Sequence, residues 1–358
     1  MIHNRRTPSQ YLLGTTLGNS LDGNEGVVAV TSAFERSALL QIAQGVNPLT
    51  HLGSDQRDEL LRFLEVLSAR GFLNRNPTQL KAPKRYFAEI DSNDLAAQDF
   101  QHRAKPELLQ SEWIDSASDG GVSTVAARSL YPILLSGRSR VITILYALLL
   151  ASGVTRVRFA DRYHQSLIES CDLGFGAITH EMLGQNFYEQ SESSRRALSL
   201  FPIDPATRHD LDTSAPIAII HYGDCDPVDL VEWSNKRTPH FVIHQPIGDE
   251  IAIGPLVFPG ESPCIRCLSL YEIDNFGYTR LERIDINGPH ELPAVTAHYV
   301  AAIAASQILH FIDQRSSTRP SDNRRNAGIG EVTYLNFQRL TEPQVVAIAR
   351  HPLCGCDY

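Results

Sequence analysis

The stretch YPILLSGRSRVITILYALLLASGVTRVRFAD, residues 131–161, decides the fold prediction for this chain. An apolar strand (Tyr131–Ser136) leads into a tight turn, a long apolar helix covers Arg138–Ser152, and a second strand (Val154–Ala160) ends on Asp161. This order is typical of the strand–helix–strand unit of a parallel sheet. The sequence therefore predicts an α/β domain built around this unit.

The turn of this unit departs from the glycine-rich pattern that binds nucleotide phosphates. That pattern reads G-x-G-x-x-G, whereas here Gly137 keeps only the first glycine, and Ser139 and Ile142 replace the other two. Glycines allow backbone N–H groups to approach a phosphate at a helix N-terminus, and Ile142 puts a β-branched side chain where helix and strand must pack closely. Asp161 follows Gly137 at a distance suited to a ribose-binding acid. We therefore interpret Gly137, Ser139 and Asp161 as a vestigial nucleotide site.

Strands and helices continue to alternate towards the C-terminus, which favours a mostly parallel sheet with helices on both faces. The later strands are predicted at Ile217–Tyr222, His240–His244, Ile251–Phe258 and Glu331–Phe337, and the later helices at Glu189–Leu200, Val228–Arg237 and Val295–Asp313. Small residues in the last helix favour close helix packing, with a subunit interface as one option.

The first 80 residues form a unit of their own. The segments YLLG and GVVAVTS read as short strands on either side of a turn-rich stretch, and helices are predicted over Phe34–Gln44 and from Ser54 or Asp55 to Gly71. This order suggests a winged-helix type of module. Residues 81–125 are expected to be a polar linker, and residues 126–358 the α/β domain.

Composition excludes several classes of protein. The formal net charge of −9 over 358 residues argues against a nucleic-acid-binding surface. The N-terminus has no apolar segment of a secretory signal, and the most apolar run, Val141–Ser152, is shorter than the roughly 20 residues of a membrane span. We therefore expect a cytoplasmic protein that does not associate with a membrane.

Four of the six cysteines form two pairs, Cys264 with Cys267 and Cys354 with Cys356. Two such pairs together can surround a tetrahedral metal ion, so the sequence predicts a structural Cys₄ zinc site. The alternative for the C-x-x-C pair is a redox dithiol, which normally stands at a helix N-terminus after a strand and has no second pair. Here Pro263 and the stretch FPGES precede the pair, which favours a zinc knuckle over that helical setting. The remaining cysteines, Cys171 and Cys225, are expected to be ordinary buried or half-buried thiols.

The stretch IGPLVFPGESPCIRCLSLYE (253–272) and the terminal HPLCGC (351–356) resemble a known family. It is the ThiF-like, ubiquitin-activating-type partner subunit of azoline-forming cyclodehydratases, which make thiazole/oxazole-modified microcins. The segments DLGFGAITHEMLGQ (172–185) and GDCDPVDL (223–230) are similar to the same family, and the N-terminal 80 residues resemble its PqqD-like recognition element. The likeness covers about three quarters of the chain.

This resemblance implies that the chain binds the leader of a precursor peptide and presents the core peptide to a separate YcaO-type cyclodehydratase, which binds ATP. Dimerisation of the chain is a further implication. By analogy, the leader adds as a strand beside Gly26–Thr31, and the helix Asp55–Arg70 forms the wall of its groove. The candidate peptide-binding residues are Val27, Val28, Ala29, Val30, Arg57, Leu60, Phe63, Leu64 and Leu67.

The leucines among these candidates have another interpretation. Leu60, Leu64 and Leu67 stand at helical spacing and can simply form the core of the module. Phe63 and Arg57 lie off that stripe, which makes them the better candidates for contacts with a peptide.

An adenylating member of the resembled superfamily needs a lysine in the helix after the second strand. No lysine occurs between Lys105 and Lys236, and Arg195 and Arg196 could supply the charge or belong to a solvated helix face. We therefore expect no functional ATP binding and no catalytic residues, with His221, His240 and His244 as structural histidines. The alternatives are an adenylating enzyme that activates a peptide carboxyl group and an adaptor that serves another peptide pathway.

Overall fold

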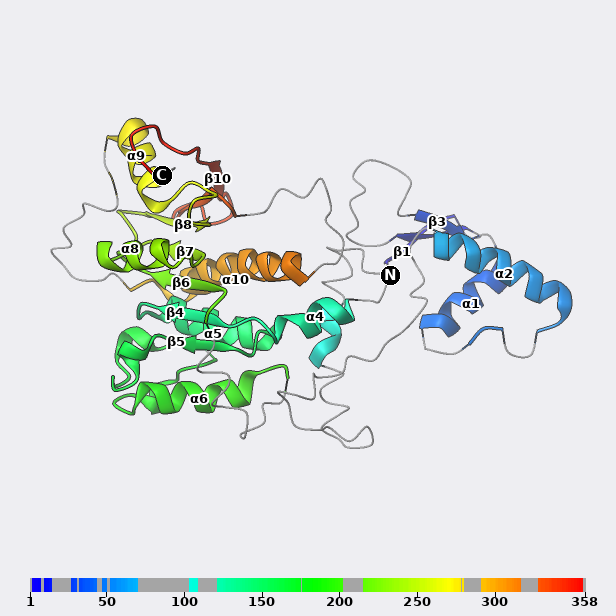
Figure 1. The fold of residues 1–358 in the computed structure, drawn as a ribbon. Helices are drawn as coiled ribbons and strands as arrows, with labels where there is room; N and C mark the ends of the chain where they lie inside the picture. The colour runs from blue at the N-terminus through cyan, green and yellow to red at the C-terminus, as the bar shows by residue number, and fades with distance from the viewer. Residues whose placement is uncertain are drawn as a thin grey trace. The chain divides into compact units, whose positions relative to one another are not determined.

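The computed structural model describes residues 2–7, 10–14, 27–30, 32–43, 47–49, 52–69, 103–108, 121–174, 176–201, 215–277, 279, 291–316 and 328–356 (Figure 1). The chain divides into two compact units. The first consists of Met1–Leu80 with Gln101–Ser123, and the second of Lys81–Phe100 with Thr124–Tyr358.

The first unit contains a three-stranded antiparallel sheet and two helices. The strands β1 (Ile2–Thr7), β2 (Gln10–Gly14) and β3 (Val27–Val30) lie in the order β1-β2-β3, so β3 pairs with β2 alone among the described strands. The strands predicted from YLLG and GVVAVTS are confirmed as β2 and β3. The strand β1 was missed because its polar sequence, IHNRRT, has no alternation of apolar residues.

The helices α1 (Ala33–Ala43) and α2 (Ser54–Ala69) confirm the two helices predicted in this unit. A capping box begins α1, in which Ser32 Oγ accepts a hydrogen bond from the Glu35 N–H and the Ser32 N–H donates to the Glu35 carboxylate. The core of the unit joins the end of β3 to one side of each helix, and it consists of Val30, Ala38, Leu39, Leu60, Phe63 and Leu67.

The second unit is built on a seven-stranded mixed sheet in the order β10-β9-β8-β7-β6-β4-β5. The strands are β4 (Ile133–Ser136), β5 (Val157–Phe159), β6 (Ala218–Tyr222), β7 (His240–Ile243), β8 (Glu250–Val257), β9 (Glu331–Asn336) and β10 (Gln344–Ala347). All six strands predicted in this region are present, and β10 was not predicted.

The expectation of a mostly parallel sheet was wrong. The strands β5, β4, β6 and β7 run parallel, whereas β8, β9 and β10 are each antiparallel to their neighbours. The connection between β7 and β8 is residues 244–249, which is too short for the crossover that a parallel pair requires. One half of the sheet is therefore parallel, and the other half is an antiparallel extension.

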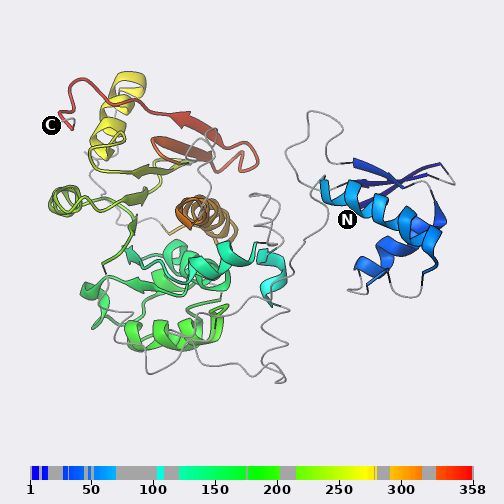
Figure 2. The ribbon, with the colours of Figure 1, turned by 45° about the vertical axis from the view of Figure 1, so that its right-hand side comes forward.

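Helices cover both faces of this sheet, as predicted (Figure 2). On one face, α5 (Arg140–Ala151) and α10 (Ala294–Ser316) pack side by side in the largest apolar cluster. On the other face lie α8 (Pro227–Asn235) and α9 (Ile265–Phe276). Adjacent residues of one strand divide between the faces: Ile220 belongs to the α5–α10 cluster, and Ile219 belongs to the cluster beneath α8.

The small residues of α10 serve packing within the unit. Ala297, Ala301 and Ala304 are fully buried in the cluster that α10 shares with α5, because alanines permit a close approach of two helices. Among the described residues one helix, Ala294–Arg315, is long and apolar enough to cross a membrane. It is mostly buried inside the unit and is a core helix.

Shorter elements complete the unit. The helix α6 (Phe187–Leu198) confirms the predicted helix in that region, while α4 (Val122–Arg128) and α9 were not predicted. Arg128 at the end of α4 is buried, and its guanidinium donates two hydrogen bonds, of 2.8 and 2.7 Å, to the carboxylate of Asp313 on α10. It also donates to the Ser152 carbonyl at the end of α5, so this one side chain connects three helices.

Candidate functional site

The turn between β4 and α5 is closed against the neighbouring strand. Gly137 has a φ of +92°, and a Cβ at this position would lie 2.3 Å from the carbonyl oxygen of Tyr222 on β6. Glycine is therefore required here by the packing of the chain on itself. The glycine that the sequence shares with nucleotide-binding turns has a structural reason that does not involve a phosphate.

The polar groups of this turn bind to side chains of the same chain. The N–H of Gly137 donates to the hydroxyl of Tyr163, 2.8 Å away. Arg162, the residue before it, donates to the same hydroxyl at 3.1 Å, to Asp229 at 3.1 Å and to the hydroxyl of Ser136. Arg162 and Tyr163 thus occupy the end of β4, where a bound phosphate would need the backbone N–H groups.

His221 extends this network from the next strand. It is the register neighbour of Ser136, and its Nδ1 lies 3.1 Å from the Ser136 hydroxyl, while its Nε2 lies 3.1 Å from the carbonyl oxygen of Asp224. Burial lowers the pKa of His221 to about 4, so the ring is neutral at pH 7. Because a carbonyl only accepts, Nε2 carries the proton and Nδ1 accepts from Ser136.

Arg138, in the same turn, is also held by internal partners. Its guanidinium forms a two-pronged interaction with the fully buried carboxylate of Asp172 and donates to the Leu167 carbonyl at 2.7 Å. Its charge lies over the ring of Phe187, and Glu169 approaches it at 3.4 Å. The arginine therefore stabilises the segment after β5, and its charge is already balanced.

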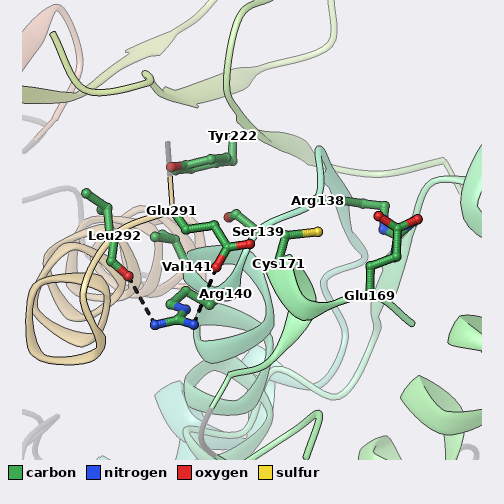
Figure 3. Close-up of a pocket in the computed structure, with 9 residues that line it drawn as sticks. All are labelled: Arg138, Ser139, Arg140, Val141, Glu169, Cys171, Tyr222, Glu291 and Leu292. Carbon is green, nitrogen blue, oxygen red and sulfur yellow. Dashed lines mark hydrogen bonds and ion pairs between the residues drawn. The ribbon is translucent and has the colours of Figure 1, made fainter. Parts of the chain in front are cut away.

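A cavity of about 170 Å³ lies beside this turn (Figure 3). It is bounded by the start of α5, by the segment around Glu169 and Cys171, by Tyr222 at the end of β6, and by Glu291 and Leu292 before α10. Pockets for drug-sized ligands or cofactors typically measure about 300–1,000 Å³. The space is therefore small for a nucleoside triphosphate.

The three residues of the predicted vestigial nucleotide site do not converge on this cavity. Ser139 lines it, but its hydroxyl caps α5 by accepting from the Ile142 N–H at 3.3 Å. Asp161 follows β5 with a side chain that is 79% exposed, and it pairs with Arg158 and His164. It is not among the residues that line the cavity.

The two arginines of α6 also differ from one another. Arg195, which we expected either to supply charge to a nucleotide or to lie on a solvated face, is buried and pairs with Glu192 at 2.6 Å. The solvated-face interpretation was wrong for Arg195, because α6 turns this side of the helix inwards. Arg196 is exposed. Arg195 does not line the cavity, so it does not replace the missing lysine there.

The histidines and single cysteines predicted to be structural lie inside the second unit. His240 and His244 are buried and contact the carbonyl oxygens of Thr238 and Gly254. Cys171 is half-buried and Cys225 is buried. Burial raises the pKa of these thiols to about 11 and about 12 respectively, so both remain protonated at neutral pH.

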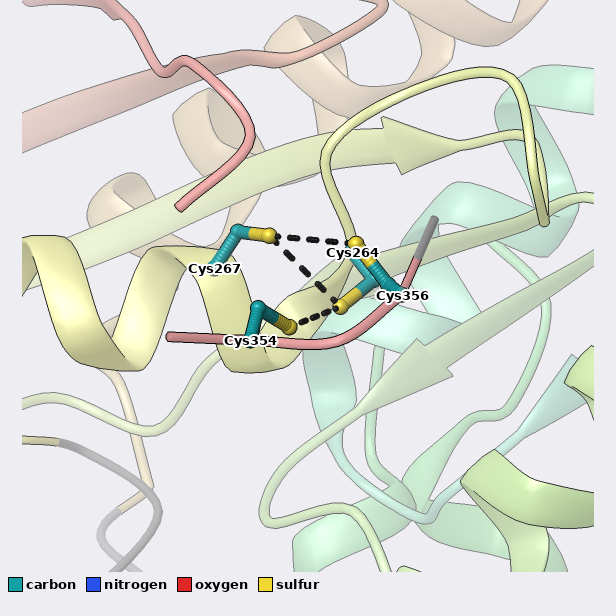
Figure 4. Close-up of side chains that lie close together, drawn as sticks. All are labelled: Cys264, Cys267, Cys354 and Cys356. Carbon is teal, nitrogen blue, oxygen red and sulfur yellow. Dashed lines mark hydrogen bonds between the residues drawn. The ribbon is translucent and has the colours of Figure 1, made fainter. Parts of the chain in front are cut away.

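The four paired cysteines come together where the C-terminal segment passes the start of α9 (Figure 4). The sulfur of Cys264 lies 3.9 Å from that of Cys267 and 3.3 Å from that of Cys354, and the sulfurs of Cys267 and Cys356 are 3.5 Å apart. A zinc ion with Zn–S bonds of about 2.3 Å separates its ligands by about 3.8 Å. The cluster is thus of the right size for one tetrahedral metal ion.

The four cysteines lie close enough to affect one another's ionisation. Burial and the neighbouring thiols raise the pKa of Cys356 to about 11 and also raise that of Cys354. Although burial opposes it, hydrogen bonds lower the pKa of Cys267, including one from the backbone N–H of His351, 3.4 Å from the sulfur. A divalent metal bound between the sulfurs would supply the positive charge that lets these thiols ionise.

One argument for this site from the sequence was wrong. The C-x-x-C pair was expected to differ from a redox dithiol by not standing at a helix N-terminus, but Cys264 is the N-cap of α9, and β8 precedes it. The observation that favours a metal is the second pair. Cys354 and Cys356 stand on either side of Gly355, whose φ is +72°, and their sulfurs lie within 4.8 Å of those of Cys264 and Cys267.

The candidate peptide-binding residues occupy two different environments. The backbone of Val27, Val28, Ala29 and Val30 forms β3, whose second edge is unpaired among the described strands. Leu60, Phe63 and Leu67 of α2 are core residues. Phe63 is only 6% exposed, so the expectation that it stands off the buried stripe was wrong.

The other two candidates on α2 lie beside the core. Arg57 is exposed, and Leu64 is half-buried against the core cluster. Leu61, which was not predicted as a candidate, is 41% exposed and falls between them at helical spacing. Together Arg57, Leu61 and Leu64 form an accessible flank of α2, which we call the α2 flank.

No protein-family model matches the chain, and no curated protein sequence matches it. Solved structures do. The microcin C7 biosynthetic enzyme MccB in complex with N-formylated MccA has a TM-score of 0.57 at 14% identity, covering 100% of this chain and 97% of that one. E. coli MccB with ATP gives 0.55 at 15% identity, covering 99% and 97%, and PaaA gives 0.56 at 14%, covering 96% and 100%. The chain shares the fold of MccB and PaaA.

Several residues of the site were missed in the sequence. Arg162 and Tyr163 directly follow the strand-ending acid, and Asp172 begins the segment DLGFGAITHEMLGQ, yet no motif marks any of them as a partner of the turn. Tyr222 reads as an ordinary strand residue, and Glu291 lies in an irregular segment. Their roles arise from tertiary contacts, and the sequence carries no local signal for these contacts.

Proposed function

We propose that this chain is a peptide-binding scaffold subunit of a biosynthetic pathway for ribosomally synthesised, modified peptides. Its first unit binds the leader of a precursor peptide, and its second unit is a nucleotide-binding type of fold that has lost its nucleotide. The observation that carries the proposal is the hydrogen bond from the Gly137 N–H to Tyr163, with Arg162 on Ser136 beside it. The chain's own side chains take the place of a phosphate.

The fold supports the peptide-binding part of this proposal. MccB is described as a microcin C7 biosynthetic enzyme, and it has been solved in complex with MccA. We take MccA to be the peptide on which that pathway acts. In our chain, the edge of β3 offers main-chain groups for strand addition, and the α2 flank offers one cation and two apolar side chains. These features fit a PqqD-like, winged-helix type of recognition element.

The sequence resemblance supplies the remaining parts of the proposal. The partner is a separate YcaO-type cyclodehydratase that uses ATP to form azolines from Cys, Ser or Thr, and this chain, alone or as a homodimer, presents the core peptide to it inside the cell. Zinc bound by Cys264, Cys267, Cys354 and Cys356 has a structural role, because four thiolates leave no coordination position for a substrate.

The second candidate is an adenylating enzyme that activates a peptide carboxyl group. Its support is that MccB has been solved with ATP and with the analogue AMPCPP. Against it stand the internal partners of Gly137 and Arg138, the small cavity, and the absence of a lysine between Lys105 and Lys236. We therefore favour the scaffold.

The α2 flank makes the peptide-binding proposal testable. Arg57→Ala is expected to weaken binding of the leader roughly three- to tenfold, because a cation at the edge of the groove contributes about 1 kcal/mol. The measurement is fluorescence anisotropy with a labelled leader peptide of the precursor encoded in the same gene neighbourhood. Arg62→Ala is the matched control, since Arg62 is exposed on another side of the same helix. Equal affinities of the two variants would contradict the assignment of the α2 flank.

A further inference from the structure

The cavity beside α5 contains polar groups that the network in the turn does not use. Tyr222 is only 6% exposed and lines the cavity, and its hydroxyl has no hydrogen-bond partner among the residues that the structure describes. Figure 3 shows its ring across the cavity from the start of α5. This hydroxyl is not among the buried polar atoms that lack a partner, so it remains accessible and can donate a hydrogen bond to a ligand in the cavity.

The start of α5 adds further donors. The first four N–H groups of a helix have no partner within it. Those of Ile142 and Thr143 are taken by the Ser139 hydroxyl and carbonyl, at 3.3 and 3.2 Å. Arg140 and Val141 both line the cavity, and their backbone N–H groups donate to no acceptor within the described part of the chain.

The charges around the cavity disfavour an anion. Glu291 lies 3.5 Å from Arg140, and Arg138 is balanced by Asp172 and Glu169. The surroundings oppose further negative charge: burial and then Asp172 raise the pKa of Cys171, and burial, Asp224 and Glu291 raise that of Tyr222 to about 12. A phosphate or carboxylate would add to this negative field.

The size of the cavity restricts the ligand further. An engineered cavity of about 150 Å³ is known to bind benzene. The present cavity, of about 170 Å³, therefore accommodates a group the size of one amino-acid side chain or one peptide unit. The ligand must be small, neutral and rich in acceptors, and it can also donate a hydrogen bond to the carboxylate of Glu291.

We propose that this cavity binds one neutral amide group of the precursor peptide. The amide carbonyl accepts from the Tyr222 hydroxyl and from the N–H groups at the start of α5, and the amide N–H donates to Glu291. The inference rests on the proposed function, since it supplies a second anchor for the peptide that the first unit captures. The amide comes either from the peptide backbone or from the carboxamide of an Asn or Gln side chain.

Ligand-observed NMR on the full chain tests this proposal with four probes: N-methylacetamide for a backbone amide, propionamide for a carboxamide, acetate, and inorganic phosphate. We expect one or both amides to bind, and the preferred one identifies the source. Tyr222→Phe is expected to weaken that binding roughly tenfold, because it leaves the amide carbonyl without one donor. The matched control is Tyr271→Phe, on α9 and outside the cavity.

Binding of acetate or phosphate in place of the amides, binding of none of the probes, or equal amide binding by Tyr222→Phe and the parent would overturn the proposal. If Tyr222→Phe does not fold, a measurement on the parent chain still tests the proposal. The amides should then slow the modification of Cys171 by methyl methanethiosulfonate, as mapped by mass spectrometry, and an unchanged rate overturns the inference. The probes contain no leader, so their failure is distinguishable from a failure of leader binding by the first unit.

Discussion

Cys267→Ser is expected to remove the metal and to lower the melting temperature of the second unit by about 10 °C, because structural zinc contributes directly to the free energy of folding. Cys267 is buried at the start of α9 and joins that helix to the terminal turn at Cys354 and Cys356. Without the metal, the thiols lose the cation that lets them ionise together, and the end of the chain is no longer held against α9.

The packing around the cluster explains why this effect should spread through the antiparallel half of the sheet. The apolar cluster beneath α9 includes Leu268 of α9, Ala252 of β8, Val332 of β9 and Ile348 just after β10. A metal bound by the four cysteines would hold α9 and the end of the chain together at the border of this apolar cluster. Calorimetry and elemental analysis check the prediction, with Cys171→Ser as the control, since Cys171 is half-buried and lies outside the cluster. A variant that melts like the parent, or a parent with well below one zinc per chain, would refute it.

A proline at the edge of β3 that pairs with no described strand is expected to weaken leader binding by about 100-fold. Strand addition depends on main-chain hydrogen bonds, and proline both removes an N–H and places its ring in the path of the incoming strand. Adjacent residues of an antiparallel strand alternate between bonding to one neighbour and facing the other. Val28 and Ala29 pair with Leu13 and Leu12 of β2, so one of the two N–H groups faces away from β2, towards the edge that pairs with no described strand.

The pair Val28→Pro and Ala29→Pro therefore contains its own control. The variant whose N–H bonds to β2 should destabilise the first unit, while the other should melt close to the parent and lose the leader in fluorescence anisotropy. If the variant that keeps the parent's melting temperature also keeps its affinity for the leader, strand addition at β3 is wrong.

The parts of the fold that follow a local period could be predicted from the sequence. The apolar run of α5 and the strands on either side of it form a strand–helix–strand unit, and each predicted strand from β4 to β9 is present. The antiparallel direction of β8 was missed although the sequence carries a sign of it, because only residues 245–250 separate the predicted strands His240–His244 and Ile251–Phe258. The pairing of β8 with β9 joins distant segments and has no local signal. The strand β10, with mostly exposed side chains, gives no period to recognise.

The candidate sites divide in the same way. The two cysteine pairs were recognisable because a metal site requires a fixed residue type at short spacing, and the structure brings all four sulfurs together. Phe63 was wrongly predicted to be accessible because only Leu60, Leu64 and Leu67 were assigned to the buried face of α2. The burial of Phe63 depends on how α2 packs against α1 and β3. Tyr163 and Arg162 could not be found, since their partners Gly137 and Ser136 are distant in the sequence.

Isothermal titration of the full chain with ATP–Mg²⁺ tests the central claim most directly, because the claim is that the chain's own side chains have replaced the nucleotide. Arg162 and Tyr163 hold the polar groups at the end of β4, and a phosphate would have to displace them. We predict no detectable binding of ATP–Mg²⁺ at sub-millimolar concentrations. A robust micromolar dissociation constant would contradict the scaffold and favour the adenylating enzyme.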